Sequence, residues 1–383
     1  MEERIKNLEN QISQVKSVIE TLDKKEFNLY FFVLDTKGNP TGGVANIYEH
    51  VKLLNELGYH AHILHEKNDY KLRSDDGTGI ADWLGEEYAA LPHISIESQQ
   101  LKVTPSDFII IPEIFSNIME QIKGFPCKKI VFLQTYNYAL ELLGIGKRWN
   151  ADYGFNDVIT TCEKQSIYVS NHFPSIRTHV VPVSIAPYFK PSEKPKIPVV
   201  TLVTRDQSEA IKIAKSFYLQ YPVYKWITFR ELRGLPKEKF AEELGKSCLA
   251  VWVDDVSGFG TFPLEAIECE TPVIGKIPNM IPEWMEEKDD NGNMAIKHNG
   301  IWTNTTLNIP ELIATYMKAW LEDAIIDDLT NGIKNSKGGY TPEKQKAKLE
   351  EVYTGIFKNR KAELNVSLDT LNEELNNIEV KTI

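Results

Sequence analysis

Residues 257–275, SGFGTFPLEAIECETPVIG, are the stretch of sequence that decides the fold. The segment begins with a glycine-rich loop, Gly258-Phe259-Gly260, and continues into an apolar run with helical spacing. The fixed φ of Pro263 suits the first turn of a helix, so we expect a helix to begin near it. Backbone N–H groups of such a loop, together with the dipole of the following helix, can bind an anion. The segment therefore predicts an anion-binding loop at the start of a helix.

Glu265 lies in the expected first turn of this helix. Its carboxylate could accept hydrogen bonds from the vicinal hydroxyls of a ribose, as acidic residues do in dinucleotide-binding folds. It could instead only complement the helix dipole, an effect of about 1 kcal/mol or less. The residue and its spacing leave both interpretations open.

The chain around residues 28–160 alternates between expected strands and helices. Residues 28–34 (NLYFFVL) are continuously apolar, as in a parallel strand that is buried on both faces. Gly42 and Gly43 then open a helical pattern that ends before Gly58. Further strands are expected at residues 61–64, 108–111, 129–132 and 157–160. Repeated βα units of this kind imply a parallel sheet with right-handed crossovers.

A proline-rich stretch divides the chain. Residues 189–198 (FKPSEKPKIP) have the composition of a stiff, extended linker. A second βα series follows, with strands expected at residues 199–203, 224–229, 249–253 and 272–274. Two doubly wound halves joined in this way form a cleft between the carboxyl ends of their sheets, where ligands of such folds bind.

Both termini carry heptad patterns. The apolar positions of the first pattern are Ile5, Leu8, Ile12, Val15, Ile19 and Leu22, and those of the second are Leu364, Leu368, Leu371, Leu375 and Ile378. These coiled-coil-like seams can be buried against each other, against another copy or against the body of the protein. An isolated helix of this length is marginal in water, which favours association with a second copy or a partner protein through residues 1–25 and 364–383.

The bulk composition indicates an ordinary globular protein. The 383 residues are 42% hydrophobic and 25% charged, enough for two α/β domains. A formal net charge of −11 disfavours nucleic-acid binding, which needs clustered Lys and Arg. The charged N-terminus and the lack of a long apolar run predict a cytoplasmic protein without a transmembrane segment. The four cysteines are expected to be buried and reduced, because they lie far apart in apolar runs.

The segment 257–275 resembles the signature of the group 1 retaining glycosyltransferases. That signature is approximately E-G-F-G-x-x-x-x-E-A-M-A-x-G-T-P-V-I, with two glutamates eight positions apart. Gly258-Phe259-Gly260, Glu265-Ala266 and residues 271–274 (TPVI) match it in register. Earlier in the chain, Gly42-Gly43 and the pattern that ends in Gly58-Tyr59-His60 resemble the Gly-Gly turn and the L-x-x-x-G-H helix end of the family. The resemblance spans about residues 27–355.

The resemblance implies the GT-B fold, in which two Rossmann-like doubly wound domains face a cleft. It also implies transfer of a sugar from a nucleotide-diphosphate donor to an unknown hydroxyl acceptor, with retention of the anomeric configuration. The donor-binding residues that it implies are Gly42, Gly43, Arg205, Gly258, Phe259, Gly260 and Glu265. Glu265 would bind the ribose, and Arg205 and the glycine backbones would bind the diphosphate. Such enzymes bind the diphosphate without a metal, so no cofactor is expected.

Three positions of the expected site differ from the family pattern. Ser257 replaces the first glutamate, and it can hydrogen-bond a sugar hydroxyl but carries no charge. Gln134 stands where family members often present a histidine at the end of a strand. We place Ser257 and Gln134 at the catalytic positions. The lysine that follows the arginine in the family is replaced, with only Lys212 nearby. The alternative is a catalytically silent GT-B protein that acts as a scaffold or subunit through its terminal helices.

The resemblance and the local patterns together divide the chain. The expected segments are an N-terminal heptad helix (1–25), a Rossmann-like domain on the acceptor side (27–188), a linker (189–198), a Rossmann-like domain on the donor side (199–340), and C-terminal helices with a heptad seam (341–383). The acceptor would bind loops of the first domain, within residues 67–87 and 134–156.

Overall fold

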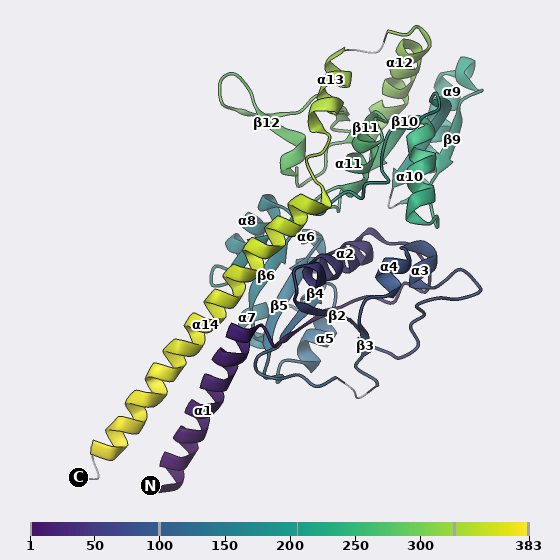
Figure 1. The fold of residues 1–383 in the computed structure, drawn as a ribbon. Helices are drawn as coiled ribbons and strands as arrows, with labels where there is room; N and C mark the ends of the chain where they lie inside the picture. Colours follow the sequence, from purple (N-terminus) through teal and green to yellow (C-terminus); the bar gives the residue numbers. More distant parts are fainter. Residues whose placement is uncertain (1, 99–100, 205, 325–326, 381–383) are drawn as a thin grey trace.

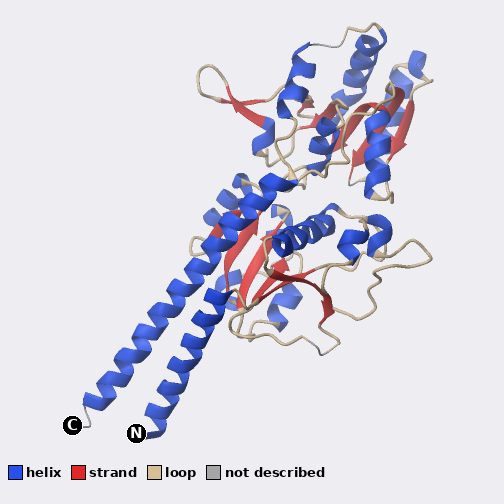
Figure 2. Cartoon of the chain, in the orientation of Figure 1, coloured by secondary structure: helices blue, strands red, loops and turns tan. Residues whose placement is uncertain are grey.

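Two parallel sheets form the cores of two α/β lobes in the computed structural model, which describes residues 2–98, 101–204, 206–324 and 327–380 (Figures 1 and 2). The first sheet has seven strands in the order β3-β2-β1-β4-β5-β6-β7, and the second has five in the order β14-β11-β10-β8-β9. Every neighbouring pair in both sheets is parallel. The expected pair of doubly wound α/β domains is confirmed.

The first sheet is covered by helices on both faces. Its strands are β1 (Asn28–Phe32), β2 (His60–His65), β3 (His93–Ser95), β4 (Phe108–Pro112), β5 (Lys128–Leu133), β6 (Phe155–Thr160) and β7 (Arg177–Val180). Its helices are α2 (Gly42–Glu56), α3 (Ile80–Trp83), α4 (Glu86–Ala89), α5 (Ser116–Gln121), α6 (Tyr136–Glu141), α7 (Trp149–Tyr153) and α8 (Glu163–His172). Phe31 and Phe32 illustrate why the strands are apolar throughout, since these neighbours belong to core clusters on opposite faces.

The second lobe is built in the same way. Its strands are β8 (Ile197–Thr204), β9 (Thr228–Glu231), β10 (Ser247–Val253), β11 (Val273–Lys276) and β14 (Ile301–Thr303), with a separate antiparallel pair, β12 (Glu286–Lys288) and β13 (Met294–Ile296). Its helices are α9 (Gln207–Gln220), α10 (Lys237–Lys246), α11 (Thr261–Glu268), α12 (Ile309–Leu321) and α13 (Asp327–Ser336), with 3₁₀ turns η1 (Pro222–Tyr224), η2 (Glu283–Met285) and η3 (Thr306–Asn308). β8 begins at Ile197, within the residues expected to form the linker.

One expected strand of this lobe is displaced. Residues 224–229 were expected to form a strand, but β9 begins at Thr228 and Tyr224 closes the turn η1. Pro222 begins this turn, and the Tyr224 ring stacks on Phe217 at a centroid distance of 6.0 Å. The aromatic side chains that suggested a strand therefore pack the end of α9 instead.

A single long helix, α14 (Pro342–Val380), joins the two lobes. It replaces the several C-terminal helices that were expected, because no proline interrupts residues 343–380. The helix runs from the second lobe along the first and continues beyond it (Figure 1). Its Tyr353 is buried against α2, where its hydroxyl lies 3.1 Å from His50 Nε2. Burial lowers the pKa of His50 to about 3, so this imidazole is neutral in the folded protein.

The two heptad seams pack against each other. α1 (Glu2–Lys24) lies antiparallel to the last part of α14, and the two helices extend together from the first lobe with both termini at the far end (Figures 1 and 2). Leu8, Ile12 and Leu22 of the first seam are buried, as is Leu364 of the second. The remaining apolar seam positions are half-buried. We call this pair of helices, residues 2–24 and 361–380, the arm.

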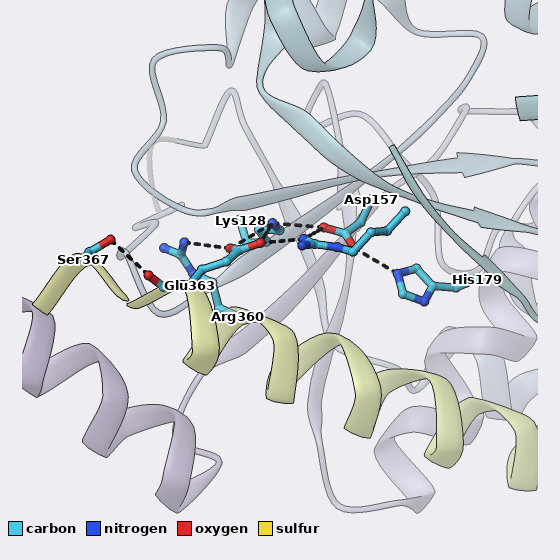
Figure 3. Close-up of polar contacts among 7 residues, drawn as sticks. Lys128, Asp157, His179, Arg360, Glu363 and Ser367 are labelled. Carbon is cyan, nitrogen blue, oxygen red and sulfur yellow. Dashed lines mark hydrogen bonds and ion pairs between the residues drawn. The ribbon is translucent and has the colours of Figure 1, made fainter. Parts of the chain in front are cut away.

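A buried ion-pair network anchors α14 to the first sheet (Figure 3). Asp157 of β6 accepts hydrogen bonds from Arg177 Nε at 2.8 Å and His179 Nε2 at 2.9 Å, and lies 2.9 Å from Lys128 Nζ. Glu363 of α14 contacts Arg177 at 2.6 Å and Lys128 at 3.2 Å. Burial alone would raise the pKa of Asp157, but its hydrogen bonds and the nearby cations hold it well below the usual range. Lys128 and Arg177 are the first residues of β5 and β7, so these two cations lie at the amino ends of their strands.

Two further expectations can be compared with the structure. All four cysteines are buried free thiols, as expected. Among the residues described, no helix is both long enough and apolar enough to cross a membrane.

Candidate functional site

Several of the residues singled out in the sequence meet where the two lobes face each other. Gln134 follows β5, and its side-chain Nε2 donates to the carbonyl oxygen of Gly43 at 3.1 Å. The side-chain Nε2 of Gln165, on α8, donates to the carbonyl oxygen of Gln134 at 3.1 Å. Gly258 lies directly against Gln165, because a Cβ added to this glycine would fall 1.7 Å from that Nε2 atom. A continuous series of contacts therefore runs from the start of α2 to the glycine-rich loop of the second lobe.

The start of α2 is open to a ligand. Gly42 and Gly43 are exposed, and a Cβ at Gly42 would meet nothing within 4 Å. Thr41 occupies the N-cap position but makes no side-chain capping hydrogen bond. The first N–H groups of this 15-residue helix thus lack a side-chain acceptor, and the helix dipole adds positive potential at the same place. This geometry suits an anion such as a phosphate.

Gln134 is held firmly beside this helix start. Its backbone N–H and that of Thr135 both donate to the buried carboxylate of Glu113, at 3.2 and 2.9 Å. Its side-chain oxygen accepts a hydrogen bond from Asn46 Nδ2 at 3.0 Å. Gln134 therefore lies next to Gly43, and its amide is occupied by protein partners.

The glycine-rich loop is ordered by its own side chains. Asp254 Oδ1 accepts from the N–H groups of Val256 and Ser257, each at 3.0 Å. The Ser257 hydroxyl oxygen accepts from Gly260 N–H at 2.9 Å. Gly260 has φ of +74°, which favours glycine, and it forms the N-cap of α11. The hydroxyl assigned to the sugar is thus already used to shape the loop.

The start of α11 corrects the expected position of Glu265. The Ser257–Gly260 contact ends the loop early, so the helix begins at Thr261 and not near Pro263. Pro263 is the third helical residue, where a missing N–H costs no intrahelical hydrogen bond. Glu265 is the fifth residue and lies beyond the first turn, which weakens the helix-dipole interpretation.

Glu265 is paired with a lysine from the neighbouring helix. Its side chain is only 6% exposed, and Oε1 lies 3.0 Å from Nζ of Lys237, at the first position of α10. The Lys237 ammonium also lies 5.9 Å from the ring centroid of Phe189 and 5.7 Å from that of Phe240. The pair therefore places a buried carboxylate and a half-buried ammonium side by side in the second lobe, between α10 and α11.

Phe259 differs from its neighbours in the loop. Its ring is buried and packs against Tyr340 at a centroid distance of 5.2 Å, and its carbonyl oxygen accepts from Trp284 Nε1 at 2.6 Å. These contacts hold the loop to the second lobe. Phe259 therefore supports the loop through packing, while Gly258 and Gly260 allow its close contacts.

Known protein structures resemble this arrangement of two lobes. Pneumococcal O-GlcNAc transferase GtfA, solved with UDP and GlcNAc, has a TM-score of 0.59 at 9% identity, covering 88% of this chain and 99% of that one. Sucrose-phosphate synthase from Thermosynechococcus elongatus has 0.60 at 13%, covering 87% and 100%. Anabaena HepE, solved with UDP and glucose, has 0.56 at 12%, covering 85% and 99%. The fold is GT-B. No protein-family model and no curated protein sequence matches the chain.

Two residues that contact the predicted site residues were missed in the sequence. Gln165 gives no local signal, because its role depends on contact with Gly258, 93 positions away. Lys237 was overlooked because the lysine was sought after Arg205, where Lys212 is exposed and lies 3.5 Å from Glu209. The sequence signal that could have pointed to Lys237 is its place at the start of a helix.

The remaining expectations for the site concern Arg205 and a metal ion. Arg205 lies outside the described residues. Among the residues that are described, no group of three or more His, Cys, Asp or Glu side chains is arranged to hold a metal ion.

Proposed function

We propose that this GT-B protein transfers a sugar from a nucleotide-diphosphate donor to a hydroxyl acceptor, with retention of configuration. The observation that carries the proposal is the series of contacts from Gly43 through Gln134 and Gln165 to Gly258. It brings an uncapped helix start and a glycine-rich loop together between the lobes. The structures of GtfA and HepE, which were solved with UDP, support a nucleotide donor.

Each part of the site has a role in this proposal. The N–H groups at Gly42 and Gly43, the loop backbone of Gly258 and Gly260, and Arg205 bind the diphosphate. These donors would stabilise the negative charge that develops on the leaving phosphate in the transition state. Glu265 binds the ribose, and Ser257 and Gln134 contact the sugar. No metal is needed, because N–H groups and cations supply the positive potential.

Lys237 adds to the assignment of Glu265. A ribose hydroxyl can accept a hydrogen bond from the ammonium and donate one to the carboxylate. The ion pair between Glu265 and Lys237 therefore presents both partners that a diol requires. It also fixes the carboxylate in place before the donor arrives.

Donor binding is expected to depend on Glu265. We expect UDP, GDP or ADP, or a sugar conjugate of one of them, to raise the thermal midpoint of the protein. A ligand at a hundred times its Kd stabilises the native state by about 2.7 kcal/mol. Glu265→Gln keeps the side-chain size but loses the charge, and should weaken binding roughly tenfold, about 1.4 kcal/mol. Differential scanning fluorimetry and calorimetric titration measure both effects.

The matched control is Glu243→Gln, which removes a carboxylate paired with Arg230 on the same lobe. This variant should bind the nucleotide as the wild type does. If no nucleotide stabilises the wild type, the donor assignment fails. If Glu265→Gln binds as well as the wild type, the ribose contact fails but the diphosphate contacts remain.

A catalytically silent scaffold is the second candidate function. It is favoured by Ser257, which carries no charge where the family has a glutamate. The Ser257 hydroxyl oxygen also already accepts a hydrogen bond from Gly260 N–H within its own loop. In this case a nucleotide could still bind, but no donor sugar would be transferred or hydrolysed. Incubation with the nucleotide sugar identified by the thermal screen, followed by detection of released nucleotide, distinguishes the two functions.

We further propose that two copies associate through the arm. Leu371 and Leu375 remain half-buried although α1 packs against them, so part of this seam is available to a second copy. Light scattering after size exclusion should give a mass above the 43.7 kDa of one chain. Leu371→Glu with Leu375→Glu should reduce that mass, whereas Val366→Glu, at a residue 67% exposed, should not. A monomeric wild-type protein would rule out this association.

A further inference from the structure

A separate cavity of about 360 Å³ lies at the carboxyl ends of β1 and β2. Its walls are the loop after β1, the loop after β2 and the short segment that leads into α3. The charged and imidazole side chains that line it are Asp35, Lys37, His65, Asp69, Lys71 and Asp76. None of them belongs to the contacts that join Gly43 to Gly258. The size lies within the range of small-molecule sites in proteins.

The walls of this cavity are held together by close backbone contact. Gly38, with φ of +80°, lies so near the other wall that an added Cβ would fall 2.6 Å from Thr78 Cα. On that wall, Lys71 Nζ lies 3.0 Å from the Asp76 carboxylate and 3.4 Å from the Thr78 hydroxyl oxygen. The cavity is therefore a shaped pocket between two fixed loops.

His65 is the buried polar group that lines this pocket. The residue is 3% exposed, and neither ring nitrogen has a hydrogen-bond partner among the described residues. Leaving such nitrogens unpartnered in a protein interior costs free energy, so a native structure usually supplies a ligand or water. Burial, and then the neighbouring His93, lower the pKa of His65 to about 3. Its imidazole is therefore neutral, with one N–H donor and one acceptor nitrogen.

The histidine beside it, His93, differs from His65 in its hydrogen bonding. His93 lies with its ring stacked on that of His65 at 5.5 Å, and both of its nitrogens have partners. Its Nδ1 donates to the Leu91 carbonyl oxygen at 2.7 Å, so its Nε2 accepts from the Tyr48 hydroxyl at 3.1 Å. His65 itself is fixed by Tyr70, whose ring stacks on it at 4.0 Å and 10°. The orientation of His65 is thus set by packing and not by hydrogen bonds.

The charges around the pocket restrict the ligand. Three carboxylates, those of Asp35, Asp69 and Asp76, face two ammonium groups, those of Lys37 and Lys71. Because Lys71 is already paired with Asp76, the remaining lining charges carry no excess of positive potential. This disfavours a phosphate or another anion. A hydroxyl group, which both donates and accepts, matches the carboxylates, the ammonium groups and the neutral imidazole alike.

We propose that this pocket binds an uncharged saccharide unit, with one of its hydroxyl groups hydrogen-bonded to a ring nitrogen of His65. Such binding needs neither a nucleotide nor the contacts around Gly258. If the protein transfers a sugar as proposed above, the bound saccharide is the acceptor. This assignment of the acceptor rests on the proposed function. The proposal thus names neutral carbohydrate, and not a phosphorylated compound, as the ligand class.

The test uses the full-length protein with histidine labelled with ¹⁵N. Methyl glucopyranoside and maltose are titrated as neutral probes, and glucose 6-phosphate as the charged one. The neutral saccharides should shift the ring-nitrogen resonances of His65 in a saturable manner. His65→Phe keeps a stacked ring but removes both nitrogens, so the fold should persist while saccharide affinity falls roughly tenfold or more, as expected for lost hydrogen bonds.

The matched control is His172→Phe, which alters another His–Tyr ring contact, with Tyr168 at 4.2 Å and a tilt of 34°, outside the pocket. It should leave saccharide binding unchanged. The proposal is overturned if neither neutral saccharide shifts the His65 resonances, if glucose 6-phosphate binds as tightly as they do, or if His65→Phe binds as the wild type does. Nucleotide binding by His65→Phe should be normal, so a failed donor screen and a failed saccharide titration are separate results.

Discussion

Asp157→Asn is expected to destabilise the folded protein by about 3 kcal/mol, because it removes a buried carboxylate that pairs with Arg177 and Lys128 in the first sheet. Asp157 is 1% exposed and contacts Arg177, His179 and Lys128. Lys128 is 7% exposed, and among the described residues its remaining ion-pair partner in this variant would be Glu363. A buried charge that loses its counter-ion costs far more than an exposed one. Urea denaturation followed by circular dichroism measures the loss.

The control for this variant is Glu56→Gln. Glu56 and Lys346 also join the first lobe to α14, at 2.8 Å, but their side chains are 46% and 34% exposed. Exposed pairs contribute about 0–1 kcal/mol, so this variant should unfold almost as the wild type does. Equal unfolding of Asp157→Asn and Glu56→Gln would contradict the anchoring role of the network.

The same network predicts the sign of the response to acid. The pKa of Asp157 is lower in the folded state than in the unfolded state, where it is about 3.9. Its contribution is therefore complete above that value and is lost as the pH falls through the folded pKa. The wild type should lose stability relative to Asp157→Asn as the pH is lowered below about 4. A constant difference between the two proteins across this range would contradict the assignment.

Gly42→Leu is expected to abolish most nucleotide binding while leaving the fold intact. The position is exposed at the first residue of α2, and a Cβ there would meet nothing within 4 Å. Leucine is also a better helix former than glycine, so the thermal midpoint should stay the same or rise. The new side chain would cover the N–H groups proposed to bind the diphosphate. We expect affinity to fall more than tenfold, about 1.4 kcal/mol or more, by calorimetric titration.

Gly355→Ala is the matched control for this variant. Gly355 lies inside α14, and a Cβ there also meets nothing within 4 Å. The substitution should stabilise the helix by up to about 1 kcal/mol and leave nucleotide affinity unchanged. Normal affinity in Gly42→Leu would remove the start of α2 from the donor site, even if Glu265 still contributes.

Local patterns in the sequence were sufficient to predict the main elements of the fold. The apolar run at residues 28–34 predicted β1, and Gly42-Gly43 predicted the first residues of α2. Strands at 108–111 and 249–253 were likewise confirmed by β4 and β10. These elements are predictable because a strand that is buried on both faces must be apolar along its whole length. β7 (Arg177–Val180), at the edge of its sheet, lacks this signal because its residues are only half-buried.

The sequence by itself determined the two βα series, the glycine-rich loop and the two heptad seams, since each depends on residues that are close together in the chain. Only the tertiary structure decided what these parts contact. It paired the seams with each other, placed Lys237 beside Glu265, and put Gln165 against Gly258. It also left His65 unpartnered at a cavity. The physical reason is that periodicity records which side of an element is buried, whereas a hydrogen bond or ion pair depends on the position of a distant partner in space.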